Sequence, residues 1–444
     1  MVTVNGEEFP LSMEELRKIV QTEFIVSDYC TDVAGTPVFF LPSNQETKIP
    51  FQRLLERLKP YNLFAILRYT SQLREHEPAS SSKKENEQTL VLKILTKMED
   101  GEQRRPVWNL VSLIATICTV TYAGHFWASD YNYLGLQISL ISWPWCGWYT
   151  DPLLLTVGYT VTLLSILGAH EMGHYITSKR RRMDVSLPFF IPFPNLFGTL
   201  GAVIFQRSPP INRDSLFDLG LMGPLSGFII ALLVTVLSIS FTPLIYPTVL
   251  YTIYQVEYQI NLFILNSLSN LYNNYPGIAF ILGQLLVNSG FWPILLISQS
   301  PFREPLIMIF LRPLLKPETT YTDFASNPFY MAAWIGFFVT SINLSPAGML
   351  DGGHMSRAIL SRRTHYIASI VVIILLAGIL IIISRFYTFL AITFAILVLL
   401  TLRREGHPGA LDEVSPLKKS RKIIFIVMMF ILIISFPPLI WNQL

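Results

Sequence analysis

The stretch Ser165–Tyr175 constrains the fold of this chain more than any other, because it places ionisable side chains inside a long apolar segment. That segment runs from Pro152 to Ser178, and a helix of about 20 apolar residues is enough to cross a bilayer. Near its end His170, Glu171 and His174 form the sequence H-E-x-x-H. On a helix the two histidines lie one turn apart and point the same way, and the glutamate borders their face. Since ionisable residues inside a membrane segment are costly and usually functional, we predict a zinc site with a neighbouring general base.

The composition is that of a polytopic membrane protein. Of 444 residues, 51% are hydrophobic and only 14% are charged, and the mean hydropathy is +0.45. These values exclude a large soluble enzyme. The net charge of +3 is too small to indicate a nucleic-acid partner, and the three cysteines form no spacing typical of a thiolate metal site or a disulfide framework.

Residues 1–98 are predicted to form a small soluble α+β domain. Ser12 to Glu15 is a capping box that begins a short helix, and the apolar spacing from Phe51 to Leu58 indicates a second helix. Strand-like runs follow at Thr36–Leu41, Asn62–Tyr69 and Thr89–Leu95, with a polar loop at Glu75–Glu87. The domain contains no nucleophile, ligand cluster or phosphate loop that we can identify. We therefore expect a regulatory or substrate-sorting module.

A charged linker, residues 99–106, leads into the membrane part of the chain. The first span is expected at Val107–Trp127, followed by a loop from Ala128 to Thr150. Further spans or apolar segments are expected at Pro152–Ser178, Leu216–Phe241, Gly277–Ser300, Pro328–Leu344, Ile367–Ser384, Tyr387–Leu402 and Ile423–Trp441, with a shorter helix within Glu304–Lys316. Basic residues at Lys179–Arg182 follow the second span, so the positive-inside rule places this end and the N-terminal domain in the cytoplasm of a multi-pass cell-membrane protein. The number of crossings between residues 242 and 327 stays open.

Two segments between these spans have unusual composition. Val185–Gln206 is apolar but is interrupted by prolines and glycines, which favours a re-entrant hairpin beside the site over a helix. Gly220, Gly223 and Gly227 line one side of the third span, and small residues let a neighbouring helix approach closely.

A second polar motif follows the apolar run Pro328–Leu344 and contains Asn343, Asp351 and His354. Basic residues after it indicate the cytoplasmic side, so topology places Asp351 at the depth of the two histidines. Catalytic zinc takes three protein ligands and keeps an open position. His170 and His174 supply two of them, and the third is either Asp351, which we favour, or His354.

The two motifs together resemble the site-2 protease family of intramembrane zinc metalloproteases. The resemblance rests on H-E-x-x-H and on N-x-x-P-x-x-x-L-D-G at Asn343–Gly352, with further similarity at Ser186–Phe190, Gly198–Gly201 and Gly223–Leu225. It covers residues about 107–402, a protease core, and is closest to the branch with an N-terminal cytoplasmic domain. Residues 403–444, a cytoplasmic loop and an extra membrane span, resemble a variable addition.

The resemblance implies a role for each residue of the two motifs. His170, His174 and Asp351 would bind Zn²⁺, Glu171 would move a proton from the activated water to the leaving amine, and Asn343 would hydrogen-bond the substrate carbonyl. The substrate would be a transmembrane protein in the lipid bilayer, hydrolysed in or near its membrane helix.

The unwound substrate could add as a strand to a binding edge at Gly198 and Gly201. A non-proteolytic zinc-bound scaffold or chaperone is the alternative; a metal or proton transporter would need polar residues in more spans than this chain has.

Overall fold

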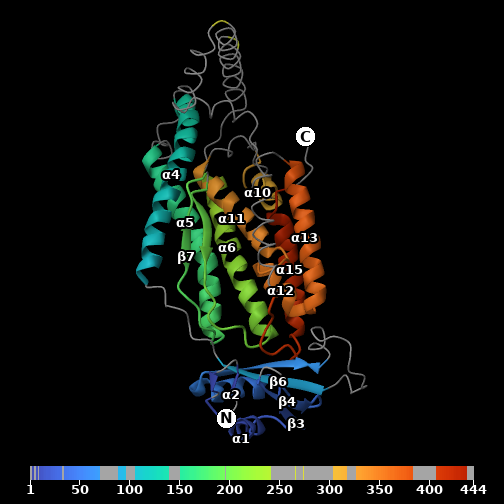
Figure 1. The fold of residues 1–444 in the computed structure, drawn as a ribbon. Helices are drawn as coiled ribbons and strands as arrows, with labels where there is room; N and C mark the ends of the chain where they lie inside the picture. Colours follow the sequence, from blue (N-terminus) through green and yellow to red (C-terminus); the bar gives the residue numbers. More distant parts are fainter. Residues whose placement is uncertain are drawn as a thin grey trace.

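The structure is a computed structural model in which an N-terminal α+β unit lies at one end of a helical bundle (Figure 1). It describes residues 10–32, 35–70, 89–96, 106–139, 151–195, 197–241, 304–317, 327–383 and 407–437, together with two short strands before residue 10 and the isolated positions 266 and 274. The loop Glu75–Glu87, the apolar runs Gly277–Ser300 and Tyr387–Leu402, and the end of the run Ile423–Trp441 lie outside the described residues.

The N-terminal unit is a four-stranded antiparallel sheet with two helices on one face (Figure 1). The strand order is β3-β4-β6-β5, and the bounds are β3 Asp28–Thr31, β4 Pro37–Pro42, β5 Leu63–Tyr69 and β6 Thr89–Thr96. Helix α1 (Met13–Gln21) begins with the predicted capping box, because the Ser12 side chain accepts from Glu15 N and the Glu15 carboxylate accepts from Ser12 N. Helix α2 (Lys48–Leu58) buries Phe51, Leu54 and Leu58 against the sheet, as its spacing predicts. A two-stranded ribbon, β1 (Thr3–Val4) and β2 (Glu7–Glu8), and the 3₁₀ turn η1 (Lys59–Tyr61) complete this part.

Three long helices are apolar and long enough to cross a membrane: α4 (Pro106–Ser139), α5 (Pro152–Arg180) and α6 (Arg213–Phe241). They confirm the first three predicted spans, and the chain is a membrane protein. One boundary prediction is wrong, because α4 continues through Ala128 to Ser139 where we expected a loop. The expectation took Trp127 as an interfacial aromatic at the end of the span, but polar and aromatic residues remain compatible with a helix when no proline interrupts them.

Helix α11 (Pro328–Leu344) occupies the centre of the bundle. Its largest side chains, Trp334, Tyr330 and Phe337, are all 1% exposed or less, which is expected for a helix that is hydrophobic on every side. The remaining described helices are α10 (Leu306–Leu315), α12 (Asp351–Ile359), α13 (Arg362–Ile383) and α15 (Lys419–Ser435). Helix α10 confirms the short helix predicted within Glu304–Lys316.

The segment between α5 and α6 forms the predicted hairpin. Strands β7 (Phe189–Pro192) and β8 (Thr199–Val203) pair antiparallel, and the pairing extends to a bridge between Val185 and Gln206. Strand β7 lies along α4, where the Ser112 hydroxyl donates to Phe190 O at 2.6 Å. The hairpin therefore runs beside the long helices and is not a surface loop (Figure 1).

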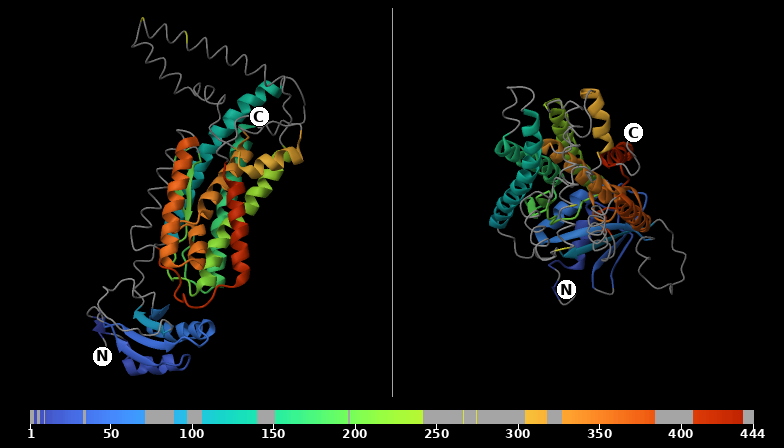
Figure 2. Two further views of the ribbon diagram at one scale, coloured as in Figure 1. Left: turned by 90° about the vertical axis from the view of Figure 1, so that its right-hand side faces the viewer. Right: turned by 90° about the horizontal axis from the view of Figure 1, so that it is seen from above.

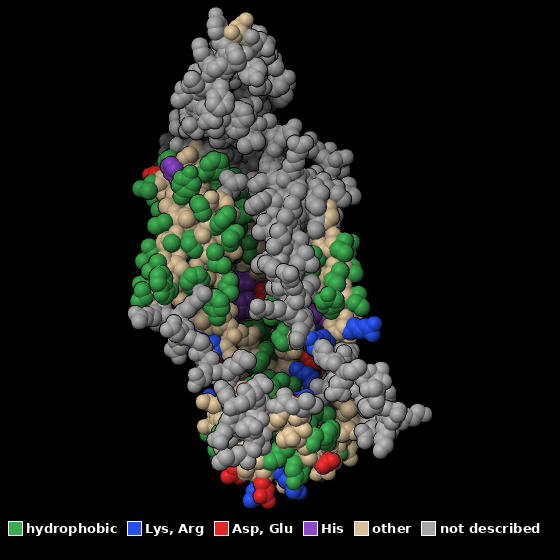
Figure 3. Space-filling view, in the orientation of Figure 1, with side chains coloured by type: hydrophobic (Ala, Val, Ile, Leu, Met, Phe, Trp, Pro, Cys, Tyr) green, Lys and Arg blue, Asp and Glu red, His purple; other side chains and the backbone are tan. Residues whose placement is uncertain are grey.

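Ion pairs join the N-terminal unit to the near ends of the long helices. Lys48 pairs with Asp214 of α6, and Glu56 pairs with Arg182 just after α5. Figure 3 shows the contrast between the two parts: hydrophobic side chains cover the visible helices, whereas charged side chains gather on the N-terminal unit and at its junction with the bundle. Figure 2 shows the same two-part arrangement from the side.

Candidate metal centre

Helix α5 presents the two histidines of the predicted site. The helix begins at a well-formed cap, where the Asp151 carboxylate accepts from Leu153 N at 2.8 Å and Leu154 N at 3.3 Å. Its apolar length then carries His170 and His174 into the bundle, one turn apart. His170 is 4% exposed, so both the helix and its packing fix the direction of the imidazole.

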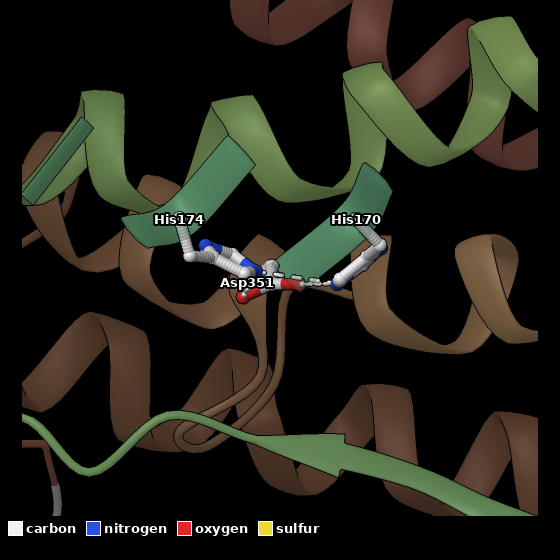
Figure 4. Close-up of side chains that lie close together, drawn as sticks. All are labelled: His170, His174 and Asp351. Carbon is white, nitrogen blue, oxygen red and sulfur yellow. Dashed lines mark hydrogen bonds and ion pairs between the residues drawn. The ribbon is translucent and has the colours of Figure 1, made fainter. Parts of the chain in front are cut away.

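Asp351 reaches the two histidines from the first residue of α12. Its Oδ2 lies 3.2 Å from His170 Nε2, its Oδ1 lies 3.3 Å from His174 Nε2, and the two Nε2 atoms are 3.2 Å apart. Figure 4 shows the three side chains pointing toward one another from two elements that are far apart in sequence. The prediction that Asp351 is the third member of this cluster agrees with this geometry.

The two imidazoles and the carboxylate are of the kinds and at the separations that suit a tetrahedral zinc ion. Zinc binds imidazole nitrogen and carboxylate oxygen at about 2.0–2.2 Å, and in a tetrahedron two ligands at such distances lie about 3.3–3.6 Å apart. The two Nε2 atoms are 3.2 Å apart, and each lies 3.2 to 3.3 Å from a different oxygen of the Asp351 carboxylate, so these separations are close to that range. We refer to the two Nε2 atoms and the Asp351 carboxylate as the ligand triangle. Among the residues that the structure describes, this is the cluster of histidine, cysteine and acidic side chains that could hold a metal.

Helix α6 orients the histidines although it supplies no ligand. The carbonyl of Leu219 can only accept, so His174 Nδ1 donates to it at 2.8 Å and leaves the lone pair on Nε2 for a metal. A Cβ added at Gly223 would lie 2.0 Å from His174 Nε2, and one added at Gly220 would lie 2.3 Å from Asp351 O. The glycine side of α6 therefore allows both ligand-bearing elements to approach the helix closely, as predicted.

Glu171 and Asn343 lie beside the triangle. Glu171 follows His170 directly in α5 and is 8% exposed. Asn343 Nδ2 lies 3.4 Å from His170 Nε2. Both Asn343 and Asp351 of the second motif therefore lie next to the histidines of the first.

The structure assigns His354, the other candidate third ligand, to a different contact. Gly409 N donates to His407 Nδ1 at 3.0 Å, so the proton of a neutral His407 ring is on Nε2. That atom lies 2.6 Å from His354 Nδ1 and donates to it. His407 is 3% exposed. Its pairing with His354 and the Leu219 carbonyl are the two features of this region that sequence reasoning missed; a backbone carbonyl gives no sequence signal, and a lone histidine in a polar loop gives a weak one.

Gly198 and Gly201 lie on the hairpin, and both have positive φ, +80° and +101°. A Cβ at Gly198 would lie 2.4 Å from Val120 Cα, so this glycine permits close packing on α4. A Cβ at Gly201 would meet nothing within 4 Å. The two glycines predicted together therefore have different surroundings.

Comparison with known proteins agrees with this geometry. The profile of Peptidase family M50 matches residues 158–385. The probable zinc metalloprotease EGY2, chloroplastic, of Arabidopsis thaliana is 26% identical over 209 residues, which are 47% of this chain and 29% of that protein. The probable zinc metalloprotease EGY1, chloroplastic, of Oryza sativa subsp. japonica is 24% identical over 294 residues, which are 65% of this chain and 41% of that protein. The matches thus span less than half the length of these relatives, and no solved structure matches the chain.

The matched region begins in α5 before His170 and ends after α13, so it contains both polar motifs, the hairpin and the glycine side of α6. It covers more than half of the chain, and its relatives carry the name of zinc metalloproteases, the class whose metal the ligand triangle fits. The chain belongs to Peptidase family M50, the site-2 protease family.

Proposed function

We propose that this protein is an intramembrane zinc endopeptidase that hydrolyses peptide bonds in or near the transmembrane helices of membrane-anchored substrates. One observation carries the proposal: two histidines on a helix long and apolar enough to span a membrane, with a buried glutamate next to the first, meet an aspartate at separations that suit tetrahedral zinc. The membership of Peptidase family M50 supports it.

His170, His174 and Asp351 would hold the ion. When bound, zinc supplies Lewis acidity, which lowers the pKa of a water molecule and polarises a peptide carbonyl. Glu171 follows His170 in the helical turn between the two histidines and borders their face, so its carboxylate is placed to accept a proton from the attacking water and to return it to the leaving nitrogen. Burial of Glu171 keeps bulk water from competing for that proton.

Asn343 is suited to bind the substrate carbonyl. Its amide lies 3.4 Å from His170 Nε2, and a metal ligand cannot accept a hydrogen bond through the same lone pair. With the ion in place, the Asn343 amide is free to donate to an oxygen at the edge of the triangle. A donor aimed at the developing oxyanion is worth about 10²–10³ in kcat in other enzymes.

The hairpin is proposed to hold the substrate in an extended conformation, since a helix shields its own peptide bonds. Leu200 and Val203 of β8 are 56% and 40% exposed, and no further strand pairs with β8 among the described residues. Gly201 is the residue to test, because Gly198 packs closely against Val120 of α4 and a side chain there would disturb that packing. Because Gly201 has φ +101°, a Gly201→Val change also strains the backbone of the hairpin edge. It should lower cleavage and leave zinc bound; loss of zinc would contradict the role in substrate binding.

The N-terminal unit is proposed to be cytoplasmic in a multi-pass cell-membrane protein. Arg181 and Arg182 after α5 and Arg421 at the start of α15 lie at the end of the bundle that faces this unit, and the positive-inside rule assigns that end to the cytoplasm. Labelling of the exposed Cys30 of the N-terminal unit, in intact and in opened cells, with Cys118 and Cys146 replaced by serine, tests the orientation.

The proposed activity is tested by co-expression with reporter single-span proteins. Wild type should cleave a reporter, and Glu171→Gln should accumulate the uncut form while it retains stoichiometric zinc. An uncleaved reporter panel with zinc-loaded wild type would favour the non-proteolytic scaffold. Cleavage by Glu171→Gln at the wild-type rate would remove Glu171 from the mechanism.

A further inference from the structure

A short segment near the C-terminus, His407–Ser415, extends the sheet of the N-terminal unit. We refer to it as the strap. Leu67 of the edge strand β5 donates through its N to Leu411 O at 2.9 Å, and its carbonyl accepts from Glu413 N at 3.3 Å. On its other side the strap pairs in the same way with residues 210–212, because Leu411 N donates to Pro210 O at 2.8 Å. The sheet thus continues from the N-terminal unit through the strap to the start of α6.

Side chains fasten the strap to the N-terminal unit. Leu411 is 7% exposed and belongs to the hydrophobic core of that unit. The Arg68 guanidinium donates to Leu411 O at 2.6 Å, and the hydroxyls of Thr47 and Ser415 lie 2.9 Å apart. These contacts join residues more than 300 positions apart, so the N-terminal unit and the strap move as one body.

The strap also forms an ion pair with α12, the helix that begins with Asp351. Glu413 accepts a hydrogen bond from Arg357 of α12 through Oε1, and its Oε2 lies 3.7 Å from Arg68 Nε. The side chains of Arg357 and Glu413 are only 2% and 6% exposed. Burial lowers the pKa of both Arg68 and Arg357, and the charge of Glu413 opposes this shift. Glu413 is therefore the shared counter-ion of one arginine from the N-terminal unit and one from α12.

Helix α12 connects this ion cluster to the metal centre. Asp351 is its first residue, and Arg357 follows six positions later, about 9 Å along the helix axis. The hydrogen bond from His407 to His354 adds a second attachment of the strap to the same helix. Since a short helix moves as a rigid element, displacement of Arg357 displaces the Asp351 carboxylate relative to His170 and His174.

We propose that Glu413 is a positioning residue of the metal centre, through which docking of the N-terminal unit by way of Arg68 sets the metal affinity of the His170–His174–Asp351 site. The inference goes beyond peptide hydrolysis, because it concerns the affinity for the ion and can be measured without any substrate. Outer partners that fix a ligand typically change metal affinity by about 10–100-fold.

The test compares Arg68→Met and Glu413→Gln with Glu56→Gln in the full chain in detergent. Zn²⁺ affinity is measured by competition with a chelator, and the visible spectrum of the Co²⁺-substituted protein reports ligand geometry. The Arg68 side chain is 16% exposed, and the Glu413–Arg357 pair does not include it. Arg68→Met therefore still tests the proposal if Glu413→Gln does not fold. Glu56→Gln is the matched control, because it breaks another ion pair between the N-terminal unit and the bundle, with Arg182, that does not touch α12.

We expect the Kd for Zn²⁺ to rise about 10-fold in Arg68→Met and about 10–100-fold in Glu413→Gln, with an altered Co²⁺ spectrum, and to stay within about two-fold of wild type in Glu56→Gln. Wild-type affinity in Arg68→Met overturns the proposal. An equal loss in Glu56→Gln also overturns it, since general docking and not Glu413 would then be responsible. Failure of wild type to cleave reporters while these affinities follow the expected order would refute the protease function alone.

Discussion

Substitution of Gly223 by alanine should weaken zinc binding although it replaces none of the three candidate ligands. The added Cβ would lie 2.0 Å from His174 Nε2. An ordinary contact needs at least 3.4 Å, so the ring must retreat by 3.4 minus 2.0, or about 1.4 Å. The ring is also held through Nδ1 by Leu219 O at 2.8 Å. Metal–ligand distances tolerate only about ±0.2 Å, so His174 can no longer complete the triangle.

The expected loss of zinc affinity is about 100-fold or more. Disturbing a group that supports a ligand costs about 10–100-fold, and displacement of the ligand itself should exceed that range. Backbone propensity acts in the opposite direction, because alanine favours a helix over glycine by about 1 kcal/mol. Global destabilisation of α6 is therefore a poor explanation of any loss that Gly223→Ala causes.

Two other glycines give a graded control series for the same assay, chelator competition for Zn²⁺ in detergent. A Cβ at Gly227 would lie 3.2 Å from Cβ and Nδ1 of His170, a contact that a shift of a few tenths of an ångström relieves, whereas one at Gly168 would meet nothing within 4 Å. The Kd should rise in the order Gly168→Ala, Gly227→Ala, Gly223→Ala. If Gly223→Ala binds zinc as tightly as Gly168→Ala, the steric reasoning is refuted.

Two further results are expected. Asp351→Asn replaces a charged ligand by a neutral one, so protein purified without added metal should contain much less zinc than wild type, with affinity lower by about 100-fold; unchanged zinc content would show that another group completes the site. Phe51→Ala empties a position that is 0% exposed in the core of the N-terminal unit and should cost about 3–5 kcal/mol, seen as faster hydrogen exchange in β4 and β6; unchanged exchange there would contradict the assigned core.

Sequence patterns predicted the helices whose formation depends on residues close together in the chain. The capping box at Ser12, the spacing around Phe51 and the apolar lengths of the long helices each have a physical cause within a few residues, and each element forms where expected apart from the end of α4. Strand β3 was missed because all four of its residues, Asp28–Thr31, are exposed. Such a strand lacks the alternation that reveals a half-buried one, and only its pairing with β4 defines it.

The residues of the candidate metal site could be predicted because membrane topology adds a long-range constraint to a short motif. Charge bias fixes which end of a span faces the cytoplasm, and this was enough to bring Asp351 to the depth of His170. The strap could not be predicted in this way. Its pairing with Leu67 crosses more than 300 residues and depends on backbone groups, and neither charge bias nor hydrophobic periodicity encodes such a contact.

Helix α6 contacts all three residues of the candidate metal site. Along two turns its Leu219 carbonyl accepts the hydrogen bond that orients His174, and Gly220, Gly223 and Gly227 leave room for Asp351, His174 and His170 respectively. Helices in lipid gain little from hydrophobic burial against each other, so close approach through small residues must hold them together. The same glycines therefore allow both the packing of the helices and the placement of the candidate ligands. A side chain added at any of the three would contact His170, His174 or Asp351 first.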